Sequence, residues 1–343
     1  MAAARPSSTA KKQKTKHEEL VGTDNMLLDD TTAISDAYFS VRGKRIKSFA
    51  TIGSSIESKS FSAESPNHKV FRAEDEDDEA LFVKMNTTSD AVAKFNREIE
   101  GLHSIRLTRT VRVPRVIALA TLPERRGAAL ILEYVKMETM STEEQRKFGE
   151  KLARMHRAFI CPKFGYFRNT WCGESLQIND WEDDWCNFFS KHRLGQQAEM
   201  ILEKHGDHEV VAKVEKLRVN LRERFFKDLK ITPSLLHGNL WSRNWGVDYS
   251  GKPVIYDPAV YFGHYEMEMS MLTMFGSPCK GFFVKYHDLL PREEPGYQDR
   301  IMLYQLYHYL NLYLQHGRGF RSPCMALVKT LLAPSSPSGS SSG

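Results

Sequence analysis

Several features that would assign this 343-residue chain to a class of protein are absent or sparse. No apolar run approaches the roughly 18 residues that a membrane-spanning helix needs. The net charge is only +5, and aromatic residues are not interleaved with basic clusters in any segment. We therefore expect neither a membrane nor a nucleic acid as a partner.

Cysteine is scarce as well. The five cysteines are an odd number at wide spacing, and they include no Cys-x-x-Cys pair. Disulfide frameworks and thiolate metal sites use cysteines at regular or close spacing. The pattern favours a reducing compartment, with most of the cysteines as small buried hydrophobes. We expect a cytoplasmic monomer.

The two ends of the chain have compositions that do not support a packed core. Residues 1–19 are Lys-rich and contain no acid before Glu18. We expect a disordered basic tail here, with a plastid or mitochondrial targeting peptide or a nuclear-localisation patch as the alternatives. Residues 334–343 are expected to form a flexible Ser/Gly tail.

Between the tails, strand-like patterns precede helical ones. Two strand-like runs flank the acidic run Glu74–Glu79, which is typical of an exposed hairpin turn. A helical pattern follows at 89–105, where apolar residues recur every three or four positions, at Val92, Phe95, Ile99 and Leu102. Two more strand-like runs come after it. From the capping-box pair Ser141 and Glu144 onward, helices dominate. This order predicts an α+β fold with a small strand-rich N-lobe (20–135) and a larger helical C-lobe (136–333).

Two charged residues of the N-lobe lie where a kinase needs them. Lys84 ends a strand that reads as buried, where a lysine is costly unless paired. Glu98 lies on the face of the following helix that carries Phe95 and Leu102. Such a Lys–Glu pair orients the ATP phosphates in kinases. The alternative is an edge lysine and a solvated glutamate.

The stretch "SLLHGNLWSRNWGV" has the spacing of a kinase catalytic loop. Asn239 and Asn244 stand five positions apart, as do the catalytic base and the magnesium-binding Asn of kinases. Asp257 follows at the end of an apolar strand, where a kinase-like site places a magnesium ligand. The alternatives are a core histidine at 237, turn-forming asparagines and a helix-capping aspartate.

These segments resemble the fructosamine-3-kinase (ketosamine-3-kinase) family, which is related to aminoglycoside phosphotransferases. "LLHGNLWSRN" matches the family's LLHGDLWSGN, and "DPAVYFGHYEME" matches DPA-x-x-YGH-x-E-x-E. Further matches are "FVKMN", "LEYVKM", "EDDWCNFFSKHRL", "MFGSP" and "YQLYHYLNLYLQHGRGFRSP", and together they run from about residue 80 to 330. The resemblance implies a two-lobed protein-kinase-like fold and ATP- and Mg²⁺-dependent phosphorylation of the 3-hydroxyl of ketosamines on glycated amines or proteins, leading to deglycation.

The resemblance also implies roles for individual residues. Lys84 and Glu98 would hold the ATP phosphates, and Glu133, Tyr134 and Val135 would form the hinge that meets adenine. In the C-lobe, Asn244 and Asp257 would bind magnesium, Asn239 would occupy the base position beside His237, and Asp184, Trp185, His264 and Glu268 would line or support the substrate pocket. Trp185 and Trp241 are candidates for stacking on the sugar, with a core role as the alternative for Trp241.

The chain departs from the family at two places. The loop that would cover the nucleotide, at 51–65, contains only Gly53 where kinases place several glycines. The base position is the amide Asn239, which accepts a hydrogen bond but cannot take up a proton. We expect an impaired ketosamine kinase; the alternatives are a pseudokinase that binds nucleotide or glycated ligand without turnover, and a kinase of the aminoglycoside or choline type.

Overall fold

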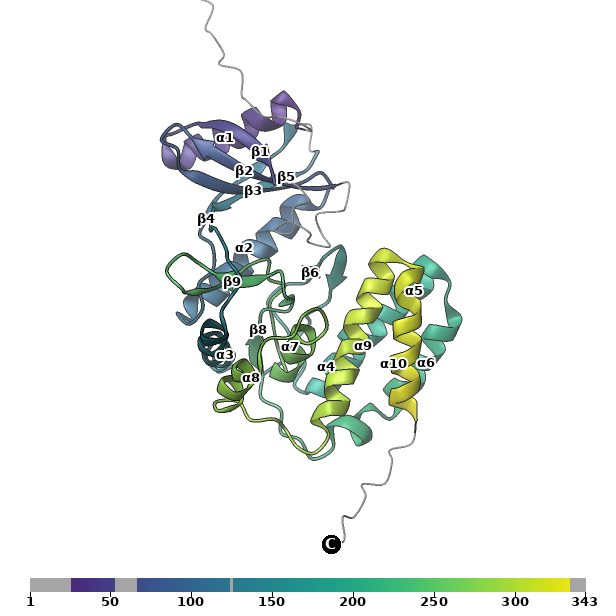
Figure 1. The fold of residues 1–343 in the computed structure, drawn as a ribbon. Coiled ribbons are helices and arrows are strands. Elements are labelled where there is room, and N and C mark those ends of the chain that lie inside the picture. Colours follow the sequence, from purple (N-terminus) through teal and green to yellow (C-terminus); the bar gives the residue numbers. More distant parts are fainter. Residues whose placement is uncertain (1–25, 53–66, 124–125, 334–343) are drawn as a thin grey trace, which may run out of the picture.

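The computed structural model describes residues 26–52, 67–123 and 126–333. The predictions for the two tails and for the glycine-poor loop around Gly53 concern residues outside these ranges. Within them, the chain forms a strand-rich lobe followed by a larger helical lobe (Figure 1). The α+β, two-lobed fold expected from the sequence is confirmed.

The N-lobe is built on one antiparallel sheet. Its strands stand in the order β1-β2-β3-β5-β4, and the predicted strand pairs correspond to β2–β3 and β4–β5. The bounds are β1 (Ile46–Thr51), β2 (His68–Asp75), β3 (Ala80–Asn86), β4 (Val116–Thr121) and β5 (Ala128–Glu133).

Two helices cover opposite faces of this sheet. Side chains alternate between the faces of a strand, so Leu81 and Val83 pack with helix α1 (Leu28–Arg42), whereas Leu130 packs with helix α2 (Ala91–Leu107). The α2 side of the sheet is continuous with the core of the C-lobe. Helix α2 is therefore the element through which the two lobes share a core.

The helices also show where the sequence patterns failed. Helix α1 was not predicted, because its buried face mixes Ile34 with the polar Thr31 and Ser35 and so lacks apolar periodicity. In α2 the expected position of Val92 on the buried face is wrong, since Val92 is exposed. Glu98 is on the buried face, as expected.

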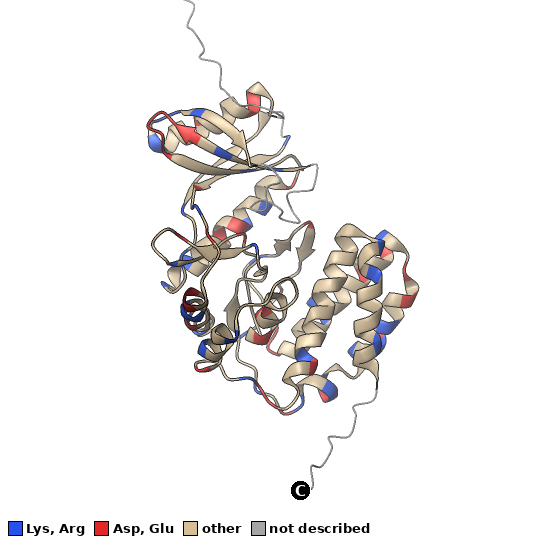
Figure 2. Ribbon diagram, in the orientation of Figure 1, with Lys and Arg blue, Asp and Glu red and all other residues tan. Residues whose placement is uncertain are grey.

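The acidic run forms the turn between β2 and β3, as predicted, and is the red loop of the N-lobe in Figure 2. Besides facing solvent, the run makes two contacts with helix α1 of the N-lobe. The Asp75 carboxylate accepts a hydrogen bond from the Tyr38 hydroxyl at 2.8 Å. Glu79 forms an ion pair with Arg42 of α1 at 2.9 Å.

The C-lobe consists mainly of helices, with three short antiparallel strand pairs between them. The predicted capping box is present at its first helix, where Ser141 Oγ accepts the Glu144 N–H and Glu144 Oε2 accepts the Ser141 N–H at 2.7 Å. No helix in the described ranges has the length and apolarity to span a bilayer. The elements are α3 (Thr142–His156), β6 (Thr170–Cys172), β7 (Ser175–Gln177), α4 (Trp185–Phe189), α5 (Gln196–His205), α6 (His208–Val219), β8 (Ser234–Leu236), β9 (Trp245–Val247), β10 (Pro253–Ile255), β11 (Tyr261–Gly263), α7 (Tyr265–Leu272), α8 (Lys280–His287), α9 (Tyr297–His316) and α10 (Arg321–Leu332).

Candidate active site

Two short antiparallel strand pairs bring together the two loops that carry the candidate catalytic residues. Strand β8 pairs with β11, and β9 pairs with β10. The loop 237–244 leads from β8 to β9, and the segment 256–260 leads from β10 to β11, so the two must run side by side. Two backbone hydrogen bonds join them: Ala259 N–H donates to His237 O at 2.8 Å, and Tyr256 N–H donates to Asn244 O at 3.1 Å.

His237 fixes the shape of the catalytic-type loop. Its Nδ1 accepts the N–H of Asn239 at 3.2 Å, so Nε2 carries the proton that is donated to Tyr256 O at 2.9 Å. Burial lowers the pKa of His237 and keeps the ring neutral. The Glu268 carboxylate supports the same loop, because it accepts the backbone N–H groups of His237 and Gly238. Both residues position the loop.

Two backbone positions show why the loops have these residues. Gly238 has φ 78°, and a Cβ there would lie 2.2 Å from Ala259 O, so only glycine fits. Asp257 has φ 59°, a left-handed conformation that is costly for a non-glycine residue and that clusters at functional sites. The next residue, Pro258, lies against Gly101 of α2.

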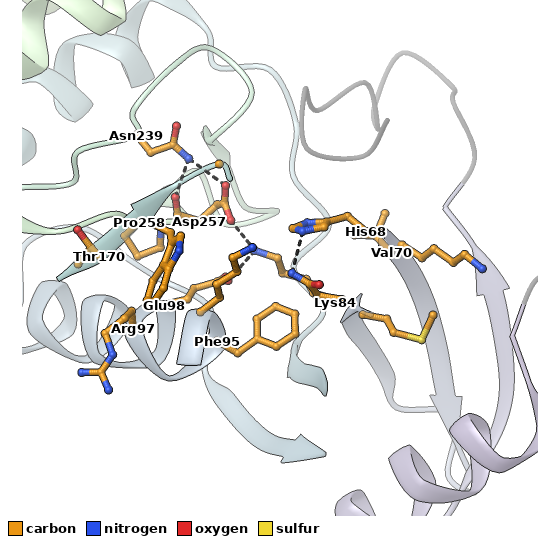
Figure 3. Close-up of a pocket in the computed structure, with 16 residues that line it drawn as sticks. His68, Val70, Lys84, Phe95, Arg97, Glu98, Thr170, Asn239, Asp257 and Pro258 are labelled. Atoms are coloured by element: carbon orange, nitrogen blue, oxygen red, sulfur yellow. Dashed lines mark hydrogen bonds and ion pairs between the residues drawn. The ribbon is translucent and has the colours of Figure 1, made fainter. Parts of the chain in front are cut away.

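An ion-pair cluster joins the N-lobe to this segment (Figure 3). Lys84 Nζ on β3 lies 2.7 Å from Glu98 Oε2 on α2 and also contacts Asp257 Oδ1. The Lys84–Glu98 pair expected from the sequence is present, and the structure adds Asp257, 173 positions away from Lys84. Three charged groups from the two lobes are therefore held at one point between them.

The charges of this cluster are strongly coupled. Burial alone would lower the pKa of Lys84, but the carboxylates of Asp257 and Glu98 raise it above its ordinary value. Burial raises the pKa of Glu98, whereas for Asp257 the attraction of Lys84 outweighs burial and lowers the pKa. One ammonium thus faces two carboxylates, and the cluster has an excess of negative charge when both are ionised.

The Asn239 amide is oriented by three neighbours. Nδ2 donates to Asp257 O at 3.1 Å and to Asp257 Oδ2 at 2.9 Å. The Cys172 thiol approaches Oδ1 at 4.0 Å. Burial raises the pKa of Cys172 to about 12, so it is a thiol donor at neutral pH. Sequence analysis treated this cysteine as a buried hydrophobe only, and its place beside the base position was missed.

The residues present fit a magnesium ion. The Nδ2 group of Asn244 donates a hydrogen bond to Asn239 O at 2.8 Å. The amide oxygen of Asn244 therefore points away from Asn239 O and is left as an acceptor. With Asp257, the set is one carboxylate and one amide oxygen; Mg²⁺ characteristically takes one or two carboxylates and completes its octahedron with phosphates and water. Accordingly, the described residues contain no cluster of three or more His, Cys, Asp or Glu that would bind a metal alone. The Oε1 atom of Glu98 is buried without a hydrogen-bond partner in the described structure, which also marks excess negative charge.

A pocket opens beside the cluster. Its cavity volume is about 80 Å³, and it is lined by β2, β3, α2, the β6–β7 hairpin, and by Asn239 and Asp257. Trp171 of β6 is in this lining and is half-buried. At the hairpin turn, Glu174 contacts Lys94 of the N-lobe at 2.7 Å and His68 at 2.8 Å, and these hydrogen bonds, that from His68 first, lower the pKa of Glu174 to about 2. Sequence analysis did not single out this hairpin.

The predicted substrate residues do not line this pocket. Asp184 caps α4, accepting the Asn187 N–H at 2.9 Å, and forms an ion pair with Arg222. Trp185 Nε1 donates to the Tyr304 hydroxyl at 2.8 Å and is 2 % exposed. Trp185 therefore packs in the core, and the expectation that it stacks on a sugar is not met by this arrangement.

His264 and Trp241 are buried too. His264 Nδ1 lies 2.7 Å from the same Tyr304 hydroxyl, and burial lowers its pKa well below the ordinary value. Trp241 is 9 % exposed and packs against Phe275, which agrees with the alternative of a core role. That Glu268 and His264 line or support the substrate pocket stays a prediction.

The expected hinge lies between β5 and α3. Glu133 is the last residue of β5, and its carboxylate contacts Arg112 and Arg115. The Tyr134 ring lies 5.5 Å from the Arg72 guanidinium. None of Glu133, Tyr134 and Val135 lines the pocket beside Lys84, so their contact with adenine stays a prediction.

Comparisons with known proteins agree with this geometry. The sequence model of the family described as fructosamine kinase matches residues 47–334. Ketosamine-3-kinase of Mus musculus is 33% identical over 281 residues, which cover 75% of this chain and 89% of the relative. The chloroplastic protein-ribulosamine 3-kinase of Oryza sativa subsp. japonica is 38% identical over 261 residues, 75% of this chain and 73% of the relative.

Solved structures show the same fold. A candidate fructosamine-3-kinase from Haemophilus somnus 129PT superposes with a TM-score of 0.78 at 25% identity, covering 89% of this chain and 98% of the other. The GDP complex of aminoglycoside 2′-phosphotransferase-IIIa superposes with a TM-score of 0.56 at 10% identity, covering 88% and 98%, and shows likeness of fold. The chain belongs to the fructosamine kinase family.

Proposed function

We propose that this protein transfers the γ-phosphate of ATP to the 3-hydroxyl of ketosamines on glycated amines or proteins, which leads to deglycation. The relatives named as ketosamine-3-kinase and protein-ribulosamine 3-kinase support the substrate class. The observation that carries the proposal is the half-buried cluster of Lys84, Glu98 and Asp257 beside a pocket that contains Asn239.

Each of these residues has a task in the transfer. Lys84 donates hydrogen bonds to phosphate oxygens, and the ion pair with Glu98 keeps its ammonium at that position. Asp257 and Asn244 would hold Mg²⁺, which neutralises charge on the phosphates when bound. The Oδ1 atom of Asn239 accepts the hydrogen bond of the sugar hydroxyl. Because an amide cannot take up the proton, the hydroxyl proton passes to a phosphate oxygen or to water as the ester forms and ADP leaves, and the missing general base costs roughly 100- to 10,000-fold in rate.

The test is ADP formation by the full chain with ATP, Mg²⁺ and either fructosyl-lysine or ribulosyl-lysine. We expect slow ADP formation that requires the ketosamine and is lost in Lys84→Met. Kanamycin and choline serve as competing acceptors for the alternative kinase class. ADP formation with one of these and not with a ketosamine would contradict the proposal.

A pseudokinase is the second candidate, and one contact favours it. The Asn239 amide donates to the carboxylate of Asp257, the expected metal ligand, so the unliganded site is stabilised in a state without metal. ATP binding by calorimetry without any ADP formation from either ketosamine would establish this alternative.

We propose a cytoplasmic monomer. The rice relative is named as chloroplastic, which supports the alternative of plastid targeting by the basic N-terminus. A fluorescent protein fused to residues 1–25 distinguishes the two, since import into an organelle would contradict the cytoplasmic assignment. Light scattering of the purified chain measures the oligomeric state.

A further inference from the structure

A second pocket lies behind the predicted hinge and shares no residue with the pocket around Lys84. Its cavity volume is about 440 Å³, and it is widely open to solvent. Both lobes form it: Arg106 comes from α2, Lys151 from α3, and Lys252 from the turn before β10. Figure 2 shows basic positions along the segments that join the sheet to the C-lobe. The ionisable lining residues are Arg106, Arg109, Arg112, Arg115, Lys151, Lys252 and Glu133.

The charge of this lining is one-sided. Six basic side chains face one carboxylate, an excess as large as the net charge of +5 of the whole chain. That carboxylate, Glu133, already contacts Arg112 and Arg115. Arg112 also contacts Asp248, which is buried outside the lining. The nearby acids are thus engaged with Arg112 and Arg115, and none of them compensates the other four cations.

Three of those cations are exposed, and their side chains make no hydrogen bond or ion pair with a residue of the described ranges: Arg106, Arg109 and Lys252. The fourth, Lys151, donates to the backbone carbonyl of Thr110 at 3.2 Å. Arg109 has a left-handed backbone with φ 56°, which is uncommon for a residue with a Cβ. Clustered like charges destabilise a folded protein unless an anion compensates them.

We propose that this pocket binds a small molecule that carries two or more phosphate groups. Arginine and lysine are the side chains that recognise phosphate, arginine with a fork of donors and lysine as a point charge. The space is of the size that proteins use for small ligands. Because the free cations come from α2, from the loop after it and from the β9–β10 turn, several anionic groups match them better than one. The bound molecule would join the N-lobe to the C-lobe.

The test is calorimetric titration of the full chain with inorganic pyrophosphate, without Mg²⁺ and at low salt. Arg106→Ser/Lys252→Ser removes one free cation from each lobe and no structural contact. Lys216→Ser/Arg318→Ser removes the same charge from exposed sites on the C-lobe helices. We expect the first double variant to weaken binding at least tenfold and the second to change it less than twofold.

Two further titrations test which pocket binds pyrophosphate and whether the ligand needs more than one phosphate group. Lys84→Met removes a phosphate-binding group of the proposed active site, and binding at the second pocket should persist in it. Inorganic phosphate should bind at least tenfold more weakly than pyrophosphate. Equal loss in both double variants, loss only in Lys84→Met, equal affinity for both anions, or binding of an RNA oligonucleotide but not of pyrophosphate would each overturn the proposal.

Discussion

Replacing Asn239 by aspartate exchanges one atom at the base position and tests what the amide does there. In the structure both hydrogen bonds of Nδ2 end on Asp257, at its carbonyl and at its carboxylate. A carboxylate at 239 has no proton to donate, so Asn239→Asp places two negative groups in contact. The substitution should therefore have opposite effects on stability and on catalysis.

The size of each effect follows from these contacts. Loss of a hydrogen bond to a charged group costs about 1.5–3 kcal/mol, and repulsion between the carboxylates adds to it. A total of about 3 kcal/mol corresponds to a Tm lower by about 4 °C in a chain of this size. The restored general base should raise kcat by roughly 100-fold or more. KM should change little, since the gain arises in the transition state.

The assay combines thermal melting with steady-state kinetics on fructosyl-lysine. We expect Mg²⁺ with ATP to raise the Tm of Asn239→Asp more than that of the wild type, because a dication held by Asp257 and Asn244 would weaken the repulsion between the two carboxylates. Asn239→Ala is the matched control: it loses the same hydrogen bonds without adding charge or a base. A variant that melts like the wild type and gains no turnover would refute the reasoning about this contact and move the pseudokinase ahead of the enzyme.

Three other predictions concern the ion-pair cluster, the turn at Gly238 and the buried His308. Lys84→Met leaves the buried carboxylate of Glu98 and the half-buried carboxylate of Asp257 without their cation, so we expect a loss of about 3 kcal/mol in the free energy of unfolding by denaturant titration; a change below 1 kcal/mol would contradict the cluster. In Gly238→Ala the new alanine would have a left-handed backbone and its Cβ would clash with Ala259 O, whereas in the control Gly206→Ala the backbone is also left-handed, at φ 62°, but the Cβ meets open space. We expect only Gly238→Ala to abolish activity. Equal losses of Tm in the two variants would argue against the clash. Burial lowers the pKa of His308 to about 4 from an ordinary 6.5, so its neutral form contributes stability above pH 6.5 that is lost as pH falls toward 4, by up to about 3 kcal/mol. His308→Gln should flatten the Tm between pH 7.5 and 4.5, and an unchanged slope would contradict this.

Local patterns predicted much of the framework, because their physical signals lie within a few residues. Strand alternation identified β2 and β3, and the Ser141–Glu144 spacing identified the first C-lobe helix. Helix α1 escaped because polar residues occupy half of its buried face. The pairing of Lys84 with Glu98 was predictable from the cost of a buried lysine.

Contacts between distant segments were not predictable in this way. Cys172 lies beside Asn239 only because the β6–β7 hairpin folds over the catalytic-type loop, and nothing in its own sequence signals this. Trp171 faces the pocket for the same reason, whereas Trp185 was favoured by a motif and is buried. A motif indicates that a residue matters without distinguishing contact with substrate from support of the fold.

The central claim is phosphate transfer to a ketosamine at this site, and product analysis tests it most directly. The full chain is incubated with ATP, Mg²⁺ and fructosyl-lysine, and phosphorus-31 NMR with proton coupling identifies the phosphorylated carbon. We expect a phosphate ester at the 3-hydroxyl, formed slowly by the wild type, faster by Asn239→Asp and not by Lys84→Met. An ester at another hydroxyl, or no ester with either the wild type or Asn239→Asp while ATP binds, would contradict it.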